Sequence, residues 1–366
     1  MGACKVCGLE SPLISGKLGV CVSCIRNAPE ASLKVTSKVH ASSRAEFGLP
    51  AFPPQALKGL SCGVCMNHCM MDRGDTGFCG VTVNRNGVLE RRDGLLDYYY
   101  DPLPTNCVAW WFCPGCTGAG YPTYAYRNGP EVGYHNLAVF YRSCTYDCLF
   151  CQNWHFRLSA GRSSTLTDPE SLARKVNKNT SCICYFGGDP SSQMLHALRT
   201  SEIALEKAKE EGGKLRICWE TNGNSLPQLL KRAAELSLGS GGVVKFDLKA
   251  WTESLNLALC SVSNRGSLQN FRTIAHQFFG RRPDLPVVTA STLLVPGYVD
   301  AYEVSRLATF LAEIDQRIPY TLLAFYPCFV MNDLPTTSRR QAQDCLAAAK
   351  EAGLSCVRLG NLHLLS

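Results

Sequence analysis

Two patterns of hydrophobic and polar residues divide the chain at about residue 136. Beyond this point, short apolar runs alternate with stretches in which apolar residues recur every three or four positions. The short runs predict buried strands, and the longer stretches predict amphipathic helices. Strands are predicted at residues 136–142, 181–186, 215–219, 243–248, 287–295, 320–325 and 356–359. Helices are predicted at residues 192–210, 226–236, 267–279, 301–314 and 337–352.

This alternation of strands and helices is typical of a parallel α/β fold. One more helix begins in the segment Thr167-Asp168-Pro169-Glu170, which combines a capping box with proline in the first turn. About six βα units predict a partial (β/α)6 barrel, in which functional residues follow the carboxyl ends of the strands. The barrel is predicted to occupy residues 136–366.

The residues before the barrel lack this alternation and fall into three predicted parts. Residues 1–27 contain two Cys-x-x-Cys pairs with glycine-containing turns and predict a small zinc-ribbon-like module. Residues 28–58 contain several prolines and no sustained periodicity, so we expect a linker that lies over a surface. Residues 59–135 are dense in Cys, Gly and Pro, and we expect short strands such as residues 80–83 with little helix.

Composition narrows the class of protein. The chain has 366 residues and 21 cysteines, without an N-terminal apolar segment typical of a secretion signal. Cysteines in such a chain indicate metal or cluster ligation in a reducing compartment, so we expect a cytoplasmic location. No apolar run is long enough to cross a membrane. The net charge is +7, but the basic residues are scattered rather than interleaved with aromatic ones, so a nucleic-acid partner is not expected.

The decisive motif, C-x3-C-x2-C, directly follows the first predicted barrel strand and contains Cys144, Cys148 and Cys151. Three thiolates at this spacing can hold a [4Fe-4S] cluster and leave its fourth iron without a protein ligand. That iron can bind the amino and carboxylate groups of S-adenosylmethionine (SAM), so that an electron from the reduced cluster breaks a C–S bond. The alternatives are a plain electron-transfer cluster with a fourth cysteine and a zinc site, although zinc prefers paired Cys-x-x-Cys arms.

This motif, with Phe150 before its last cysteine, resembles the hallmark of the radical SAM superfamily. The continuation CQNW resembles the branch around pyruvate formate-lyase activating enzyme, and more narrowly its AmmeMemoRadiSam-type proteins. The resemblance runs from about residue 60 to the C-terminus through FGGDP, ETNG, KFDLK and LVPG. It implies a radical SAM barrel that cleaves SAM reductively to a 5′-deoxyadenosyl radical, which abstracts hydrogen from a substrate.

The same resemblance implies which strand ends bind SAM. Gly187, Gly188 and Asp189 match the GGE-type motif whose backbone receives the SAM amino group, with Asp in place of Glu. A plain strand-to-helix turn is the alternative. The next two strand ends correspond to positions near the methionyl and ribose parts of SAM, where a carboxylate pair can hold a monovalent cation. These residues are Glu220, Thr221, Asn222, Asp247 and Lys249. An ordinary salt bridge between Lys249 and a carboxylate is the alternative.

Two further sets contain four cysteines each. Cys4, Cys7, Cys21 and Cys24 fit tetrahedral zinc, with a rubredoxin-like iron or a docking module as alternatives. Cys62, Cys65, Cys69 and Cys79 could close a zinc site, which we favour, or hold an auxiliary cluster.

The remaining cysteines have less defined roles. A third set, completed by His135 or another thiol, could include Cys107, Cys113 and Cys116. Cys328 follows the sixth strand and could face the mouth of the barrel as a hydrogen-atom donor. The others are expected in the hydrophobic core: Cys182, Cys184, Cys218, Cys260, Cys345 and Cys356.

The resemblance to activating enzymes implies a protein or peptide substrate and an electron donor such as flavodoxin or ferredoxin. A second hypothesis is radical C-methylation of a protein side chain, with or without cobalamin, although the chain has no Asp-x-His-x-x-Gly motif for a corrinoid. A third is a non-catalytic zinc and iron–sulfur protein that binds nucleic acid. The GGDP, ETNG and KFDLK segments at the predicted strand ends disfavour this third hypothesis.

Overall fold

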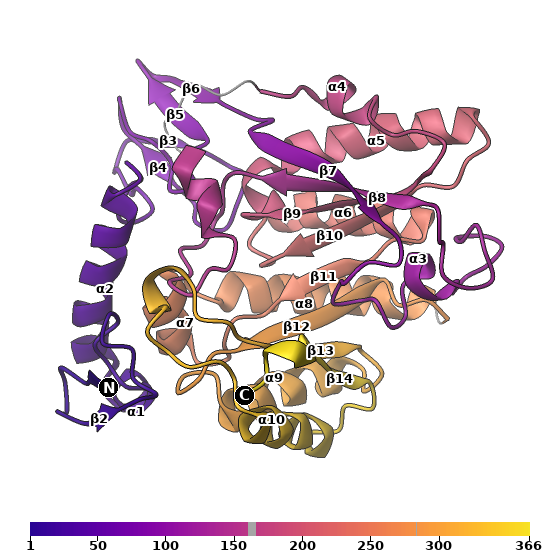
Figure 1. Cartoon of the computed structure of the whole chain (residues 1–366). Helices are drawn as coiled ribbons and strands as arrows, with labels where there is room; N and C mark the ends of the chain where they lie inside the picture. The colour runs from indigo at the N-terminus through magenta and orange to yellow at the C-terminus, as the bar shows by residue number, and fades with distance from the viewer. Residues whose placement is uncertain (160–165, 283) are drawn as a thin grey trace.

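The computed structural model of the chain describes residues 1–159, 166–282 and 284–366. Its central element is an eight-stranded sheet in the order β14-β13-β12-β11-β10-β9-β8-β7 (Figure 1). Seven neighbouring strands are parallel: β8 (His135–Tyr141), β9 (Thr180–Gly187), β10 (Arg216–Thr221), β11 (Val244–Asp247), β12 (Val288–Leu294), β13 (Tyr320–Ala324) and β14 (Val357–Gly360). All seven predicted strands are confirmed to within about two residues, as is the α/β fold class.

Helices connect the parallel strands and cover one side of the sheet (Figure 1). They are α4 (Pro169–Ala173), α5 (Met194–Glu210), α6 (Pro227–Ser240), α7 (Glu253–Cys260), α8 (Arg265–Phe278), α9 (Ala301–Ile314) and α10 (Arg339–Glu351). Helix α4 begins where predicted, and the Asp168 carboxylate caps it by accepting a hydrogen bond from the Ser171 amide at 2.7 Å. The predicted order of strands and helices is therefore present.

The two faces of the sheet differ in chemistry because residues two apart on a strand share a face. Leu137, Ile183 and Trp219 lie on the face under the helices and are fully buried. Trp219 donates its indole hydrogen bond to the Ala233 carbonyl of α6 at 3.1 Å. The opposite face carries polar and thiol side chains such as Glu220 and Lys245, which line two cavities.

The cysteine-rich residues before the barrel form short strands, as expected. Strands β3 (Leu60–Ser61) and β4 (Met70–Met71) pair, as do β5 (Thr82–Arg85) and β6 (Val88–Arg91). Strand β7 (Leu96–Pro102) adds an antiparallel edge to β8, and α3 (Pro114–Thr117) is one short turn of helix. The edge strand was not predicted, since its run of Tyr98, Tyr99 and Tyr100 is largely exposed and shows no alternation.

The expectation of an irregular linker over residues 28–58 is wrong for its first half. Helix α2 (Pro29–Ala45) starts at a proline and runs beside α1 (Val22–Asn27) and α7. Its buried side chains are polar, including Thr36, His40 and Arg44, so no hydrophobic periodicity marks the helix. The domain boundaries themselves stay predictions.

The N-terminal module, with β1 (Gly2–Ala3) and β2 (Glu10–Ser11), packs on the loop that follows β12. Arg26 makes ion pairs with Asp300 at 2.8 Å and Glu303 at 2.9 Å. A Cβ atom on Gly297 would lie 2.0 Å from the Leu13 carbonyl oxygen, so only glycine allows this contact. Among the described residues, none of the helices has the length and apolar character that a bilayer crossing requires.

Candidate functional site

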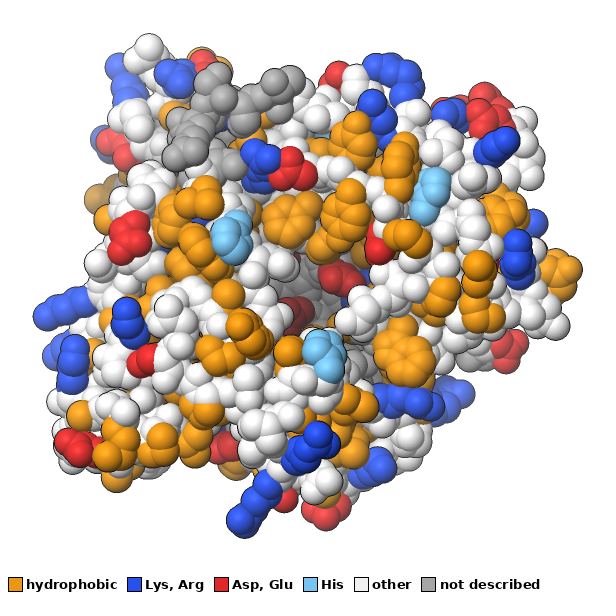
Figure 2. Space-filling model, viewed as in Figure 1, with side chains coloured by type: hydrophobic (Ala, Val, Ile, Leu, Met, Phe, Trp, Pro, Cys, Tyr) orange, Lys and Arg blue, Asp and Glu red, His pale blue; other side chains and the backbone are white. Residues whose placement is uncertain are grey.

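A cavity of about 210 Å³ lies at the carboxyl ends of the parallel strands. All residues predicted to bind the cluster or SAM contribute to its lining, from the three motif cysteines to the ends of β9, β10 and β11. Figure 2 shows a hollow near the centre of the displayed face, with acidic side chains inside it. The structure therefore brings the predicted site residues together, while their individual roles stay predictions.

The three-cysteine loop is fixed by backbone hydrogen bonds to distant elements. The Asp147 and Leu149 amides each donate to a carbonyl at the end of α7, at 2.9 Å. The Leu149 carbonyl accepts from the Val330 and Met331 amides, each at 3.0 Å. Within the loop, the Tyr146 amide donates to Cys144 Sγ at 3.3 Å. These contacts fix the backbone of the loop that carries the three thiols.

A buried ion network lies directly behind this loop, and the sequence did not reveal it. The Asp147 carboxylate contacts His40 Nδ1 at 2.7 Å and accepts from Arg157 Nη1 at 2.5 Å. Arg44 Nη1 lies 3.5 Å from the same carboxylate. Burial alone would raise the pKa of Asp147, but the hydrogen bond to His40 and the two guanidinium groups lower it to about 2. Helix α2 is thereby joined to the cluster loop.

Two glycines allow the end of β9 to approach the cluster loop closely. A Cβ atom on Gly188 would lie 2.1 Å from the Ser143 carbonyl oxygen, and Gly187 has a φ of +105°. The Gly188 amide donates to the Tyr141 carbonyl, and the Asp189 amide donates to the Ser143 carbonyl, both at 2.8 Å. The FGGDP segment is thus hydrogen-bonded to the residue before Cys144.

Asp189 is a buried carboxylate held by hydrogen-bond donors. Its oxygens accept from the backbone amides of Ser191 and Asn222, both at 2.6 Å, and from the Thr221 hydroxyl. Desolvation raises the pKa of Asp189 to about 6 despite these donors. Among the described residues, no lysine or arginine forms an ion pair with this carboxylate, so it can accept a cationic ligand.

The carboxylates at the next two strand ends already have cationic partners. Lys245 Nζ lies 2.9 Å from Glu220 Oε1, and Lys249 pairs with Asp247. The ordinary salt bridge that the sequence left open is therefore present, and both lysines compete with a monovalent cation. One oxygen, Asp247 Oδ1, is buried without a hydrogen-bond partner in the described structure.

Among the motif cysteines, Cys148 is buried, and Cys144 and Cys151 are partly exposed. Burial raises the pKa of the Cys151 thiol to about 11, although Arg157 and Lys249 act in the opposite direction. Burial also raises the pKa of Cys144. Such thiols lose their protons when a metal binds, so assembly of a cluster is coupled to proton release.

The first four-cysteine set is preformed. The ligand atoms of Cys4, Cys7, Cys21 and Cys24 all lie within 4.8 Å of one another. Cys7 Sγ and Cys21 Sγ are 3.8 Å apart, which is about the separation that tetrahedral zinc with 2.3 Å bonds requires. The geometry fits zinc, and the identity of the metal stays a prediction.

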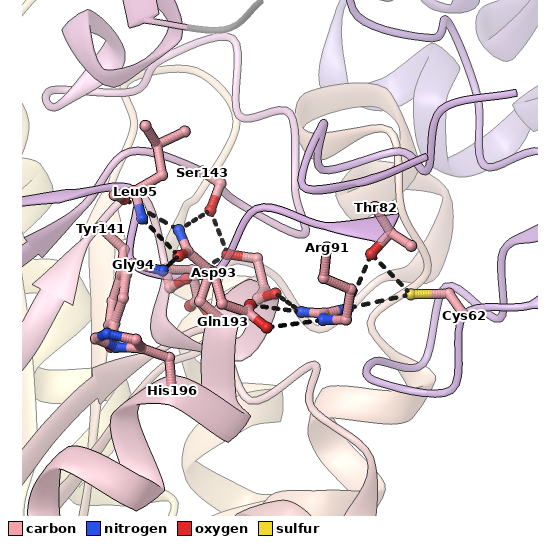
Figure 3. A network of polar contacts seen from close by, with 12 residues as sticks. Cys62, Thr82, Arg91, Asp93, Gly94, Leu95, Tyr141, Ser143, Gln193 and His196 are labelled. Carbon is pink, nitrogen blue, oxygen red and sulfur yellow. Dashed lines mark hydrogen bonds and ion pairs between the residues drawn. The ribbon is translucent and has the colours of Figure 1, made fainter. Parts of the chain in front are cut away.

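The sulfur atoms of the second four-cysteine set are farther apart than those of the first set. This second set consists of Cys62, Cys65, Cys69 and Cys79. Across the parts of the chain that the structure describes, its four sulfur atoms do not meet the distance that the first set satisfies. Figure 3 shows how it connects to the cluster loop: Arg91 donates to Cys62 Sγ at 3.6 Å and pairs with Asp93. Gln193 accepts from the Gly94 amide at 2.7 Å and donates to the Ser143 hydroxyl at 2.8 Å. Zinc at this set is not supported by the spacing.

The expected placement of Cys328 needs correction, and His135 has partners of its own. Cys328 lines an outer groove and does not contribute to the lining of the cavity, so it does not face the predicted mouth. His135 hydrogen-bonds through Nε2 with the Thr180 hydroxyl at 2.8 Å and packs against Tyr100, and its role as a fourth ligand stays a prediction.

Comparison with known families agrees with this geometry. Residues 138–308 match the model of the radical SAM superfamily. Residues 138–308 therefore form a radical SAM domain. This domain covers most of the segment from β8 to α9 and contains the cysteine motif and the three strand ends that are predicted to bind SAM.

Two curated relatives come from Methanocaldococcus jannaschii. The uncharacterized protein MJ0808 is 23% identical over 315 residues, which are 83% of this chain and 81% of the relative. A protein named "Putative glycyl-radical enzyme activating enzyme MJ1632" is 27% identical over 214 residues, covering 57% of this chain and 75% of the relative.

Two solved structures are also similar. A domain of pyruvate-formate lyase-activating enzyme from Bacteroides vulgatus is 22% identical with a TM-score of 0.38, over 49% of this chain and 98% of that domain. Streptococcus suis SuiB bound to SAM is 15% identical with a TM-score of 0.46, over 64% of this chain and 52% of SuiB.

Proposed function

We propose that this radical SAM enzyme cleaves SAM at a [4Fe-4S] cluster held by Cys144, Cys148 and Cys151, and that it abstracts hydrogen from a protein or peptide. The observation that carries the proposal is that the three thiols and the predicted SAM-binding strand ends line one cavity. When bound, the cluster supplies the electron that splits SAM into methionine and a 5′-deoxyadenosyl radical.

The charge distribution around the cavity fits a negatively charged cluster. Arg44 and Arg157 face a single carboxylate, that of Asp147, so one positive charge remains uncompensated behind the loop. Arg157 and Lys249 both lower the pKa of Cys151 through their charges, although burial has the larger effect. Positive charge and hydrogen bonds near the sulfur atoms stabilise thiolate-bound clusters and tune their potential.

The other side of the cavity fits SAM. The Asp189 carboxylate has donors but no cationic partner among the described residues, and the SAM ammonium group would supply that charge. The unpaired Asp247 Oδ1 suits a hydroxyl donor such as a ribose hydroxyl. Phe150 is buried in the lining of the cavity, and the ammonium of Lys249 lies 5.8 Å from its ring centroid.

The test is formation of 5′-deoxyadenosine by anaerobically reconstituted protein with dithionite and SAM. We expect the product from the native chain and none from Cys144→Ala, Cys148→Ala or Cys151→Ala. Cys345→Ala is the matched control, because Cys345 is fully buried in α10, outside the cavity lining. Product formation that persists in any of the three motif variants contradicts the proposal.

The substrate class rests on the relative named as a glycyl-radical enzyme activating enzyme, because such an enzyme acts on a protein. A substrate can be detected without knowing its identity by using SAM and deuterated cell protein. Deuterium in 5′-deoxyadenosine after incubation with the protein fraction, but not with the small-molecule fraction, supports a polypeptide. The reverse result contradicts it.

A basic groove beside the cluster loop suits an acidic electron donor such as flavodoxin. The groove encloses about 940 Å³. Its lysines are Lys5, Lys17, Lys34 and Lys38. Trp154, three residues after the last motif cysteine, stacks on Phe329 in this groove at 5.5 Å. Opposite charges on two partners accelerate their encounter.

This docking is tested by comparing two reductants. Lys34→Glu with Lys38→Glu should slow flavodoxin-driven formation of 5′-deoxyadenosine and leave the dithionite-driven rate unchanged. Lys178→Glu with Lys231→Glu, at exposed positions outside the groove, should change neither rate. Equal flavodoxin-driven rates in both pairs of variants contradict docking at the groove.

A further inference from the structure

A second cavity of about 200 Å³ adjoins the SAM cavity on the same polar face of the sheet. Its walls include Asn136, Cys182 and Arg216, which lie at the starts of β8, β9 and β10. Glu220 and Lys245 contribute to both cavities. The second cavity therefore lies toward the amino ends of the strands, directly adjacent to the first.

Five thiols line this cavity, which is unusual for the interior of a (β/α) barrel. Such interiors are normally filled by branched apolar side chains. Here the lining cysteines are Cys107, Cys113, Cys182, Cys184 and Cys218, and a sixth, Cys116, contacts Cys113. Cys182 and Cys184 are buried, as expected, Cys218 is partly exposed, and all three also line this cavity.

The sheet register brings the strand thiols together. Cys182 and Cys184 are two residues apart on β9, so they point to the same face. Cys184 lies directly opposite Cys218 of β10. Neighbouring strands are about 4.8 Å apart, so the three thiols form one compact patch.

The segment between β7 and β8 places the other thiols against this patch. Lys245 Nζ lies 3.2 Å from Cys107 Sγ and 3.1 Å from Cys184 Sγ. One ammonium thus connects a loop thiol with a strand thiol. The segment is anchored on both sides, because Glu131 pairs with Arg216 at 2.6 Å and the Val108 carbonyl accepts from the Thr321 hydroxyl at 2.9 Å.

The size of the second cavity and the spacing of its thiols indicate which metal groups it can hold. Thiolates are soft ligands that bind iron–sulfur clusters, zinc and Cu(I). A single zinc ion needs four ligand atoms in one small tetrahedron, and in the described part of the chain only the Cys4 set is that compact. An apolar cavity of about 150 Å³ already holds a benzene-sized guest. The thiols therefore surround a space larger than one ion.

We propose that this cavity binds a second iron–sulfur cluster through the loop cysteines Cys107 and Cys113 and the strand cysteines Cys182, Cys184 and Cys218. Arg216 and Lys245 lie at opposite ends of the thiol patch, where each is held by a carboxylate, Glu131 and Glu220 respectively, and each can donate a hydrogen bond toward cluster sulfur. The proposal goes beyond the proposed function, since it concerns a site that the SAM reaction does not require.

The first test measures iron and acid-labile sulfide in anaerobically reconstituted protein. The test uses a triple variant in which Cys182→Ala, Cys184→Ala and Cys218→Ala are combined. Compared with the native chain, it should lose about two to four irons and as many sulfides per chain, which is the content of one cluster. The same variant should still form 5′-deoxyadenosine, a reaction that depends on Cys144. A failure of the second-cluster proposal can therefore be distinguished from a failure of the proposed SAM reaction. Cys345→Ala with Cys356→Ala should lose no iron, because neither residue lines the cavity.

The second test uses the unmodified chain, so it does not depend on how the variants fold. Anaerobic alkylation followed by mass spectrometry should label Cys107 and Cys113, which are partly exposed, in the metal-free protein and not after reconstitution. Equal labelling in both states, unchanged iron in the triple variant, or zinc in place of iron would each overturn the proposal.

Discussion

Replacement of Asp147 by Asn tests whether the buried ion network holds the cluster loop. The carboxylate is the only acidic group that faces both Arg44 and Arg157 in the described ion pairs, and all three side chains are at most 1% exposed. The lowering of the Asp147 pKa from 3.8 to about 2 corresponds to about 2 kcal/mol in favour of the charged form. Removal of one partner from a buried pair also leaves the other charge uncompensated, and the total loss is typically about 3–5 kcal/mol.

We therefore expect Asp147→Asn to lower the free energy of unfolding by about 3–5 kcal/mol. Anaerobic urea unfolding, followed by tryptophan fluorescence and circular dichroism, measures this difference. Asp315→Asn is the matched control, since its partner Arg317 is exposed and the pair is on the surface. Asp147→Asn combined with Arg157→Met should recover part of the loss, because only one of the two guanidinium groups, that of Arg44, then lacks a carboxylate. A loss for Asp147→Asn no larger than that of Asp315→Asn refutes the reasoning.

Three further predictions concern other parts of the molecule. Gly188→Ala should reduce the iron content and lower the free energy of unfolding by about 1–3 kcal/mol, because its Cβ atom would meet the Ser143 carbonyl. Gly239→Ala in α6 is the control, since its Cβ atom would meet no other atom, and it should change neither quantity. Similar iron contents in the two variants would contradict this prediction. Metal analysis should find zinc in the native chain and in Cys356→Ser, and should find none in Cys7→Ser, because Cys7 belongs to the compact four-cysteine set. Zinc retained in Cys7→Ser would argue against this set as the zinc site. Burial lowers the pKa of His196, which accepts from Tyr141 and donates to the Thr167 carbonyl. The unfolded chain therefore binds a proton at His196 more readily than the folded chain does, so the contribution of His196 to stability is complete above about pH 6.5 and declines as the pH falls below that value. On acidification, the melting temperature of the native chain should fall more steeply than that of His196→Gln. Parallel pH profiles would show that His196 does not contribute.

The sequence predicted the parts of the structure whose signals are local. Each barrel strand is a short apolar run, and each is present close to its predicted bounds. The motif cysteines and the FGGDP, ETNG and KFDLK segments follow such strands, and parallel strands bring their carboxyl ends to one edge. That is why the predicted site residues meet in one cavity.

The features that the sequence did not reveal depend on tertiary contacts. Helix α2 buries Thr36, His40 and Arg44, which no hydrophobic pattern can mark. Asp147 lies between two motif cysteines, but its partners are 107 residues away in His40 and 10 residues away in Arg157. The strand cysteines look like core residues because an apolar run does not show which face of a strand borders a cavity.

The central claim is that three thiolates leave one iron free to bind SAM. Electron–nuclear double resonance of the reduced protein, with SAM labelled with ¹⁵N at its amino group, tests it most directly. The account predicts a ¹⁵N coupling to the cluster that disappears when unlabelled SAM replaces the labelled compound. A cluster signal that is identical with labelled SAM, unlabelled SAM and no SAM would contradict it.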